Sequence, residues 1–239
     1  GCTKAGGSDM EYIKEKGTMV VGITVYPPMD YKDENGEWIG FDAEFAKLVA
    51  KELGVKAEFV VIDWGKKFSE LKIKEIDCIW NGMTITDDVK NNTSYTNPYV
   101  INAQVVVTKA DVAANYKNAD SIKDISIAVE NDSAGMGALK DIGITDYTAL
   151  LDQAAALMEV DAGTSANAII DSLMAGAMVG EGTSYPDLVV TDQKLTEELY
   201  GAGCRKDSDL TSFINEVFYE TYTSGKLQEI AATYGVEAA

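Results

Sequence analysis

Short apolar runs alternate with amphipathic segments along the first third of the chain. Residues 18–25 are rich in β-branched side chains and predict a buried strand, and residues 57–62 and 77–80 predict two more. Between the first two, residues 41–53 carry apolar side chains at helical spacing and end at Gly54, which is typical of a helix. Strands that alternate with helices usually pair in parallel, so this order predicts an α/β fold.

A second alternation follows a long extended run. The valine-rich residues 99–109 are too long for a short connection and predict one long strand. Residues 125–191 then repeat the pattern of strands and helices, and residues 200–205 predict a late strand. The apolar stripe over residues 210–222 is typical of a helix that needs an apolar surface to cover it.

The composition argues against several classes of function. The 239 residues include 20 basic and 39 acidic side chains, and a net charge of −19 spread along the chain argues against nucleic acid or an anionic membrane surface as a partner. The chain contains no histidine, which excludes Ser-His and Cys-His catalysis and histidine-based zinc sites. Cys78 and Cys204 lack metal-ligand spacing, so we expect free thiols, and we expect no metal or cofactor.

The segment at residues 77–91 is a candidate floor of a ligand site. Its apolar start predicts a strand, Gly82 in a predicted turn permits close approach of the backbone to a ligand, and Thr86-Asp87-Asp88 is typical of a helix start. The N–H groups at such a helix start favour the negative end of a small molecule. An ordinary connection between a strand and a helix would have the same residues, so both interpretations stay open.

Short motifs over nearly the whole chain share their order and spacing with a known family. The central motif, Asp-x-x-x-x-Gly-Met-Thr-Ile-Thr from Asp77, is followed by Asn97-Pro98-Tyr99 and Gln104-Val105-Val106-Val107. Further matches are Gly40-Phe41-Asp42, Asp63-Trp64, Ile169-Ile170-Asp171 and Gly225-Lys226-Leu227-Gln228-Glu229-Ile230. Together they resemble the extracellular amino-acid-binding proteins of bacterial ABC importers. One departure is Val89, where that family usually has an arginine.

The resemblance implies a periplasmic-binding-protein-like α/β fold, with two lobes joined by a two-strand hinge and a ligand cleft between them. Residues 10–106 and 193–239 are expected to form lobe 1 and residues 107–192 lobe 2, after a flexible tether at residues 1–9. It also implies a monomeric solute-binding protein that is not an enzyme. Such a protein captures an amino acid or close analogue by hinge closure and delivers it to a membrane ABC permease.

The family positions also imply a set of site residues. The predicted ligand-binding residues are Tyr26, Tyr31, Trp64, Asn81, Gly82, Met83, Thr84, Ser133, Ala134, Gly135 and Asp171. In the family, rings at the positions of Tyr26 and Trp64 pack on the ligand, and the aspartate at the position of Asp171 binds the α-ammonium. Aromatic packing, turn chemistry at Gly82 and helix capping by Ser133 or Asp171 are the alternatives.

Val89 cannot form the bidentate pair with a carboxylate that an arginine forms. Lys90 is adjacent, but on a helix the next residue points elsewhere, and Arg205 lies in a predicted late strand whose relation to the cleft is unknown. We therefore expect backbone N–H groups around Thr84 and Ser133 to hold the ligand carboxylate without an opposing full charge.

The pair Gly1-Cys2 resembles the processed start of a bacterial lipoprotein. It implies a protein on the outer face of the bacterial cell membrane, attached only through a lipid on Cys2, and no apolar run is long enough to span a bilayer. Two other functions stay open. A cyclohexadienyl-dehydratase-like enzyme on this scaffold would need facing carboxylates, for which Asp30 and Asp171 are candidates, and the second alternative is the sensor domain of a larger receptor.

Overall fold

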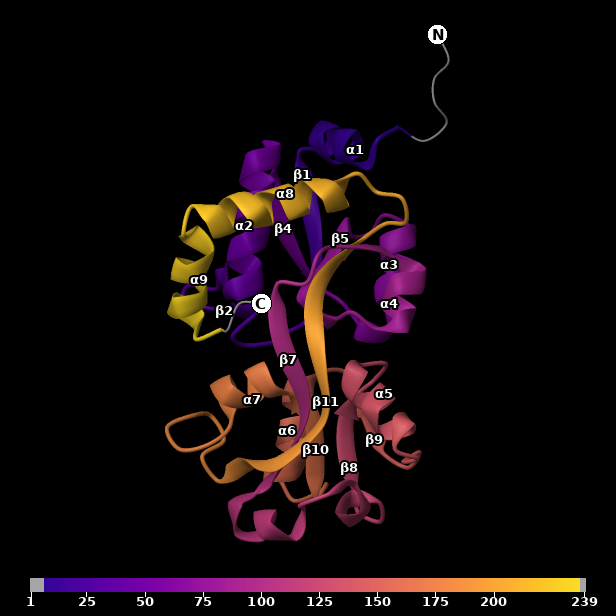
Figure 1. Cartoon of the computed structure of the whole chain (residues 1–239), viewed down its shortest axis with the longest axis vertical. Helices are drawn as coiled ribbons and strands as arrows, with labels where there is room; N and C mark the ends of the chain where they lie inside the picture. The colour runs from indigo at the N-terminus through magenta and orange to yellow at the C-terminus, as the bar shows by residue number, and fades with distance from the viewer. Residues whose placement is uncertain (1–6, 237–239) are drawn as a thin grey trace.

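The computed structural model describes residues 7–236 and has the predicted α/β fold. Figure 1 shows an elongated molecule in which two groups of helices and strands lie one above the other. Two long strands, β7 (Val100–Lys109) and β11 (Leu188–Cys204), run from one group into the other. No helix in residues 7–236 is both long and apolar enough to cross a membrane. Cys2, the predicted lipidation site, lies outside the described residues and stays a prediction.

A single nine-stranded sheet extends through both groups, in the order β4-β1-β5-β11-β7-β10-β8-β9 with β6 paired to β11. The pairs of β1 with β4 and β5 are parallel, as are those of β8 with β9 and β10, whereas β11 is antiparallel to β5 and β7. The other strands of the sheet are β1 (Thr18–Ile23), β4 (Lys56–Val61), β5 (Cys78–Thr84), β6 (Ser94–Tyr95), β8 (Ile127–Glu130), β9 (Thr148–Leu150) and β10 (Asn167–Asp171).

Helices cover both halves of the sheet, and two of them form where the apolar stripes of residues 41–53 and 210–222 predicted them. The upper helices in Figure 1 are α1 (Asp9–Lys16), α2 (Phe41–Leu53), α3 (Lys67–Lys72), α4 (Asp87–Asn92), α8 (Leu210–Thr223) and α9 (Lys226–Tyr234). The lower ones are α5 (Ala134–Asp141), α6 (Gln153–Asp161) and α7 (Ser172–Met178). The short 3₁₀ helices are η1 (Trp64–Lys66), η2 (Ala110–Asn115) and η3 (Ala119–Ile122). A separate hairpin consists of β2 (Tyr31–Lys32) and β3 (Trp38–Ile39).

The predicted stripe on α2 forms the centre of the upper core. Phe45 and Trp80 both pack edge-on against Phe218 of α8, with ring centroids 5.0 and 5.9 Å apart. Trp80 is fully buried within β5, as its position inside a predicted strand indicates. The apolar face of α8 therefore covers the same half of the sheet as α2.

The central segment differs from the prediction in one respect. Residue 82 was expected in a turn, but β5 continues through Gly82 to Thr84, and α4 then begins after Thr86, whose hydroxyl caps it. Gly82 adopts φ +54° inside the strand, a conformation that glycine takes without a Cβ clash. The pairing of Thr84 with Tyr200 on β11 holds this strand end in the sheet.

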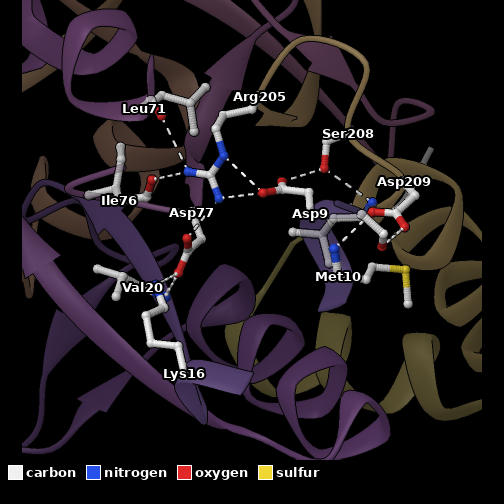
Figure 2. A network of polar contacts seen from close by, with 12 residues as sticks. Asp9, Met10, Lys16, Val20, Leu71, Ile76, Asp77, Arg205, Ser208 and Asp209 are labelled. Atoms are coloured by element: carbon white, nitrogen blue, oxygen red, sulfur yellow. Dashed lines mark hydrogen bonds and ion pairs between the residues drawn. The ribbon is translucent and has the colours of Figure 1, made fainter. Parts of the chain in front are cut away.

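Arg205 organises a polar network at the end of β11, drawn in Figure 2. Its Nη2 lies 2.8 Å from Asp77 Oδ1 and 2.6 Å from Asp9 Oδ1, and Lys16 Nζ lies 2.5 Å from Asp77 Oδ2. Asp9 belongs to α1, and Ser8 caps that helix, so the predicted tether at residues 1–9 is wrong for these two residues. The network fixes α1 to the sheet through charges that are largely out of water.

Candidate functional site

A cavity of about 690 Å³ lies where the two groups of elements meet. Its upper wall comes from η1, α3, the end of β5 and α4, and its lower wall comes from the turn between β8 and α5, from α5 itself and from Asp171. Thr196 and Glu198 of β11 complete it. Because strand ends and helix starts from both halves meet here, this cavity is the candidate ligand site.

Most of the predicted site residues line this cavity. Those that do are Trp64, Asn81, Gly82, Met83, Thr84, Ser133, Ala134 and Asp171. Tyr26, Tyr31 and Gly135 are not among the lining residues. Gly135 instead permits close packing, because a Cβ there would lie 2.9 Å from Gln104 Oε1.

Tyr26 lies beneath the cavity floor and not in its wall. Its ring is 1% exposed, its hydroxyl is hydrogen-bonded to that of Tyr200, and a Cβ on Gly82 would lie 2.1 Å from its Cε1. The end of a strand does not show whether a side chain points into the cleft or into the core. Tyr31 is half-buried and packs edge-on against Tyr234, with centroids 6.4 Å apart. The proposed stacking of Tyr26 on a ligand therefore finds no support in this geometry.

Asp171 forms the centre of an acidic group. Its Oδ1 accepts hydrogen bonds from Asn102 Nδ2 at 2.6 Å and Gln104 Nε2 at 2.7 Å, and its Oδ2 accepts one from Gln153 Nε2 at 2.5 Å. Asp171 precedes α7, but its side chain makes no capping bond, so the N-cap alternative is not realised. Burial and the neighbouring charge of Glu198 raise the pKa of Asp171 to about 6 despite these amide donors.

Glu198 is a second carboxylate beside Asp171. Its Oε1 accepts hydrogen bonds from Gln104 Nε2 at 2.5 Å, Asn102 Nδ2 at 3.1 Å and Thr84 Oγ1 at 3.0 Å. Asn102 and Gln104 thus donate to both carboxylates and hold them together. Two acids with shared amide donors form a strongly negative point that favours a cationic group.

Glu130 adds a third carboxylate to the same cavity. Its side chain is 4% exposed at the end of β8, and its Oε2 has no hydrogen-bond partner within residues 7–236. Burial, with Asp171 next in importance, raises the pKa of Glu130 well above its usual range. Glu130 is among the residues that line the cavity, so it adds negative charge to this site.

Two aromatic side chains and a lysine also line the cavity. Lys67 Nζ lies 4.7 Å from the ring centroid of Trp64 and 4.7 Å from that of Phe68. It donates to the carbonyl oxygens of Trp64 at 3.2 Å and Asp132 at 3.5 Å. Val89 lines the cavity as a buried apolar residue.

A family model described as bacterial extracellular solute-binding proteins, family 3, matches residues 19–237. The chain belongs to this family. The family predicted from the motifs is therefore confirmed. As a family 3 protein, the chain is 27% identical over 227 residues to the L-cystine-binding protein TcyJ of Escherichia coli (strain K12), a match that covers 92% of this chain and 83% of that protein.

Solved structures of similar proteins have the same fold. A P235GK mutant of ArgBP from T. maritima superimposes with a TM-score of 0.88 at 31% identity, over 95% of this chain and 98% of that one. The ancestral amino acid-binding protein AncCDT-1, described as a precursor of cyclohexadienyl dehydratase, matches with a TM-score of 0.85 at 29% identity, over 95% and 99%. The periplasmic-binding-protein fold expected from the sequence is thus confirmed.

Two polar groups that could have met a ligand carboxylate are engaged elsewhere in this family 3 protein. Gly82 N–H donates to Asp42 Oδ2 at 2.5 Å, so it is not free to bind a ligand carboxylate. Arg205 belongs to the network around Asp77 and lies about 20 Å along β11 from Glu198, so it does not replace the missing arginine. The expectation that backbone N–H groups around Thr84 and Ser133 hold the ligand carboxylate stays a prediction.

Asp30, expected to face Asp171 in an enzyme, lies elsewhere. It is fully buried beside Asp42, and its carboxylate oxygens have no hydrogen-bond partner within residues 7–236. Burial and the charge of Asp42 raise its pKa well above the usual range. The pair of carboxylates that does meet in the cavity is Asp171 and Glu198.

The sequence reading missed Glu198, Asn102, Gln104 and Lys67. A signal existed for two of them, because Asn102 and Gln104 are polar residues two apart in an otherwise apolar strand and so share one face of the sheet. No local signal identified Glu198, which reaches Asp171 only because β7 pairs with both β10 and β11.

Proposed function

We propose that this protein is an extracytoplasmic solute-binding protein that captures an amino acid or close analogue and delivers it to an ABC importer. The observation that carries the proposal is the acidic group of buried Asp171 and half-buried Glu198, held by shared amide donors inside the cavity. Its charge and position suit the α-ammonium of an amino acid. TcyJ is named as an L-cystine-binding protein, which supports the same class of ligand.

Ligand capture would proceed by hinge closure of a monomer. We propose that residues 10–106 and 193–239 move as one lobe and residues 107–192 as the other. Register shifts between β11 and β7 lie at Val190/Lys194 and Lys194/Thr196, close to the proposed crossing point. An irregular ladder can absorb a change in backbone angle more easily than a regular one, which supports a hinge there. A ligand that contacts both lobes then stabilises the closed state.

The protein would work outside the cytoplasm, together with a membrane permease. Membership of a family of extracellular solute-binding proteins supports an extracytoplasmic location and a membrane permease as the partner. A lipid on Cys2 would hold the protein at the outer face of the membrane. Growth with an alkyne-labelled fatty acid tests this, since the wild type should be labelled and a Cys2→Ser variant should not.

A ligand panel tests the proposed function. Thermal unfolding is measured with each of the twenty protein amino acids, L-cystine and L-ornithine, and then with the N-acetylated form of every compound that stabilises. At least one free amino acid should raise the melting temperature, and its N-acetylated form should not, because acetylation removes the ammonium that Asp171 binds. If no amino acid stabilises the protein, or if acetylated forms stabilise it equally, the proposed function is wrong.

A second candidate function is a dehydratase on the same scaffold. The specific observation in its favour is the proximity of Asp171 and Glu198, since two neighbouring carboxyl groups can act as general acid and general base. AncCDT-1 is described as a precursor of such an enzyme, yet as an amino acid-binding protein itself. Incubation with prephenate or arogenate decides between the two, and we expect both compounds to be recovered unchanged.

A further inference from the structure

Lys67 is a buried cation without an ion-pair partner. Its side chain is only 6% exposed and lines the cavity, and no carboxylate within residues 7–236 lies within ion-pair distance of it. Its two hydrogen bonds go to backbone carbonyls, which carry no net charge. The charges of nearby carboxylates, first of them Glu130, act on Lys67 from beyond ion-pair distance, so this buried ammonium has no directly bonded negative partner among the described residues.

The surroundings fix the position of this ammonium. The rings of Trp64 and Phe68 each lie 4.7 Å from Nζ, and cation–π attraction favours that arrangement. The carbonyl of Trp64 holds it from the upper wall, and the carbonyl of Asp132 holds it from the lower wall. Lys67 therefore lies in the cavity as an ordered charge and not as a mobile surface chain.

A second positive feature meets Lys67 at the same place. Asp132, whose carbonyl accepts from Nζ, immediately precedes Ser133, the N-cap of α5, and Ala134 at the helix start lines the cavity. The first N–H groups of a helix have no partner within the helix, and its dipole favours an anion. A full charge and a helix start therefore act on one point between the two walls.

Other cations near the cavity are less suitable. Lys140 also lines it, but it is exposed and belongs to the last turn of α5, where the helix dipole disfavours an anion. Lys90 is exposed and is not among the lining residues, and Arg205 is engaged with Asp77 and Asp9. Val89, at the position of the family arginine, offers only an apolar surface.

We propose that Lys67 and the N-terminus of α5 together bind the carboxylate of the ligand, in place of the arginine that the family usually has at position 89. This inference rests on the proposed function and deepens it. It makes the cavity dipolar, with the ammonium of the ligand at Asp171 and Glu198 and its carboxylate at Lys67. Because Lys67 and α5 belong to opposite walls, the carboxylate would also connect the two walls.

Pairs of amino acids and their decarboxylated amines separate this role from a structural one. The probes are L-arginine with agmatine, L-lysine with cadaverine and L-cystine with cystamine, extended by the corresponding pair for any other amino acid that binds the wild type. Each is titrated calorimetrically into wild-type protein and into Lys67→Met. The matched control is Lys140→Met, which removes the exposed lysine of the same cavity.

We expect the wild type to bind the amino acid at least about 30-fold more tightly than its amine. Lys67→Met should weaken binding of the amino acid by about 30-fold or more and change binding of the amine by less than about threefold. Lys67→Arg should keep most of the preference for the acid, and Lys140→Met should change neither affinity by more than about threefold.

Other outcomes overturn the inference. Equal losses for acid and amine would make Lys67 a structural residue, and an unchanged affinity for the acid would place the carboxylate elsewhere. Failure of the wild type to bind any amino acid would refute the proposed function itself, and this is visible before any variant is made. If the melting curve shows that Lys67→Met does not fold, Lys67→Gln and Lys67→Arg give the same comparison.

Discussion

Asp171→Asn is the substitution that most clearly separates ligand binding from folding. It keeps the size of the side chain and removes the charge that faces the cavity. With a pKa of about 6, Asp171 is about nine-tenths ionised at pH 7, so the ammonium meets a full charge in the wild type. Loss of a buried, hydrogen-bonded charge pair costs about 2–5 kcal/mol. Glu198 shares the same amide donors and stays in place, so we expect the lower part of that range, about 2–3 kcal/mol.

The assay is calorimetric titration with the amino acid that stabilises the wild type most. Asp171→Asn should weaken binding about 30- to 150-fold. Its melting temperature without ligand should change little, because removal of a charge that burial disfavours opposes the loss of an accepted hydrogen bond. The matched control is Asp192→Asn, an exposed aspartate of β11 outside the cavity, which should bind as the wild type does. An unchanged affinity in Asp171→Asn would refute the assigned role.

Three further predictions concern pH and stability. Affinity should fall about tenfold per unit as the pH drops below about 6 in titrations, because protonated Asp171 must first lose its proton; a flat profile would contradict this. Burial raises the pKa of Asp42 to about 7 from 3.8, so this group favours folding below pH 4, and that contribution is lost as pH rises through 7. Urea unfolding without ligand should therefore show a smaller loss of stability between pH 5 and pH 8 in Asp42→Asn than in wild type. Arg205→Ala should reduce the free energy of unfolding by about 3 kcal/mol, because it removes a positive charge that pairs with the buried carboxylate of Asp77. Lys226→Ala, which removes an exposed ion pair with Glu229, should reduce it by less than about 0.5 kcal/mol. Equal effects of the two substitutions would contradict the role of the network.

The sequence predicts those features of the fold that depend on local periodicity. The apolar stripe of residues 41–53 predicts a helix and the valine-rich run of residues 99–109 predicts a strand, and both form as α2 and β7. Asp171 was identifiable because a carboxylate after an apolar strand needs a special partner. In each case a few neighbouring residues contain the information.

Features that depend on distant parts of the chain were not predictable in this way. The sequence places Tyr26 at the end of a strand and therefore near the cleft. Its ring nevertheless points into the core, where Gly82 has no Cβ and leaves room for it. In the sequence Lys67 looks like an ordinary exposed lysine, but in the fold it is buried against the rings of Trp64 and Phe68 and near the carbonyl of Asp132. These orientations follow from packing between elements, which periodicity does not encode.

Native mass spectrometry tests the central claim most directly. Purified protein is incubated with an equimolar mixture of the twenty protein amino acids, L-cystine and L-ornithine, exchanged into volatile buffer near neutral pH and sprayed under non-denaturing conditions. The account predicts one bound molecule per protein with the mass of an amino acid in the wild type, and a strongly reduced bound fraction in Asp171→Asn. A wild type without any bound amino acid, or an equal bound fraction in the variant, would contradict it.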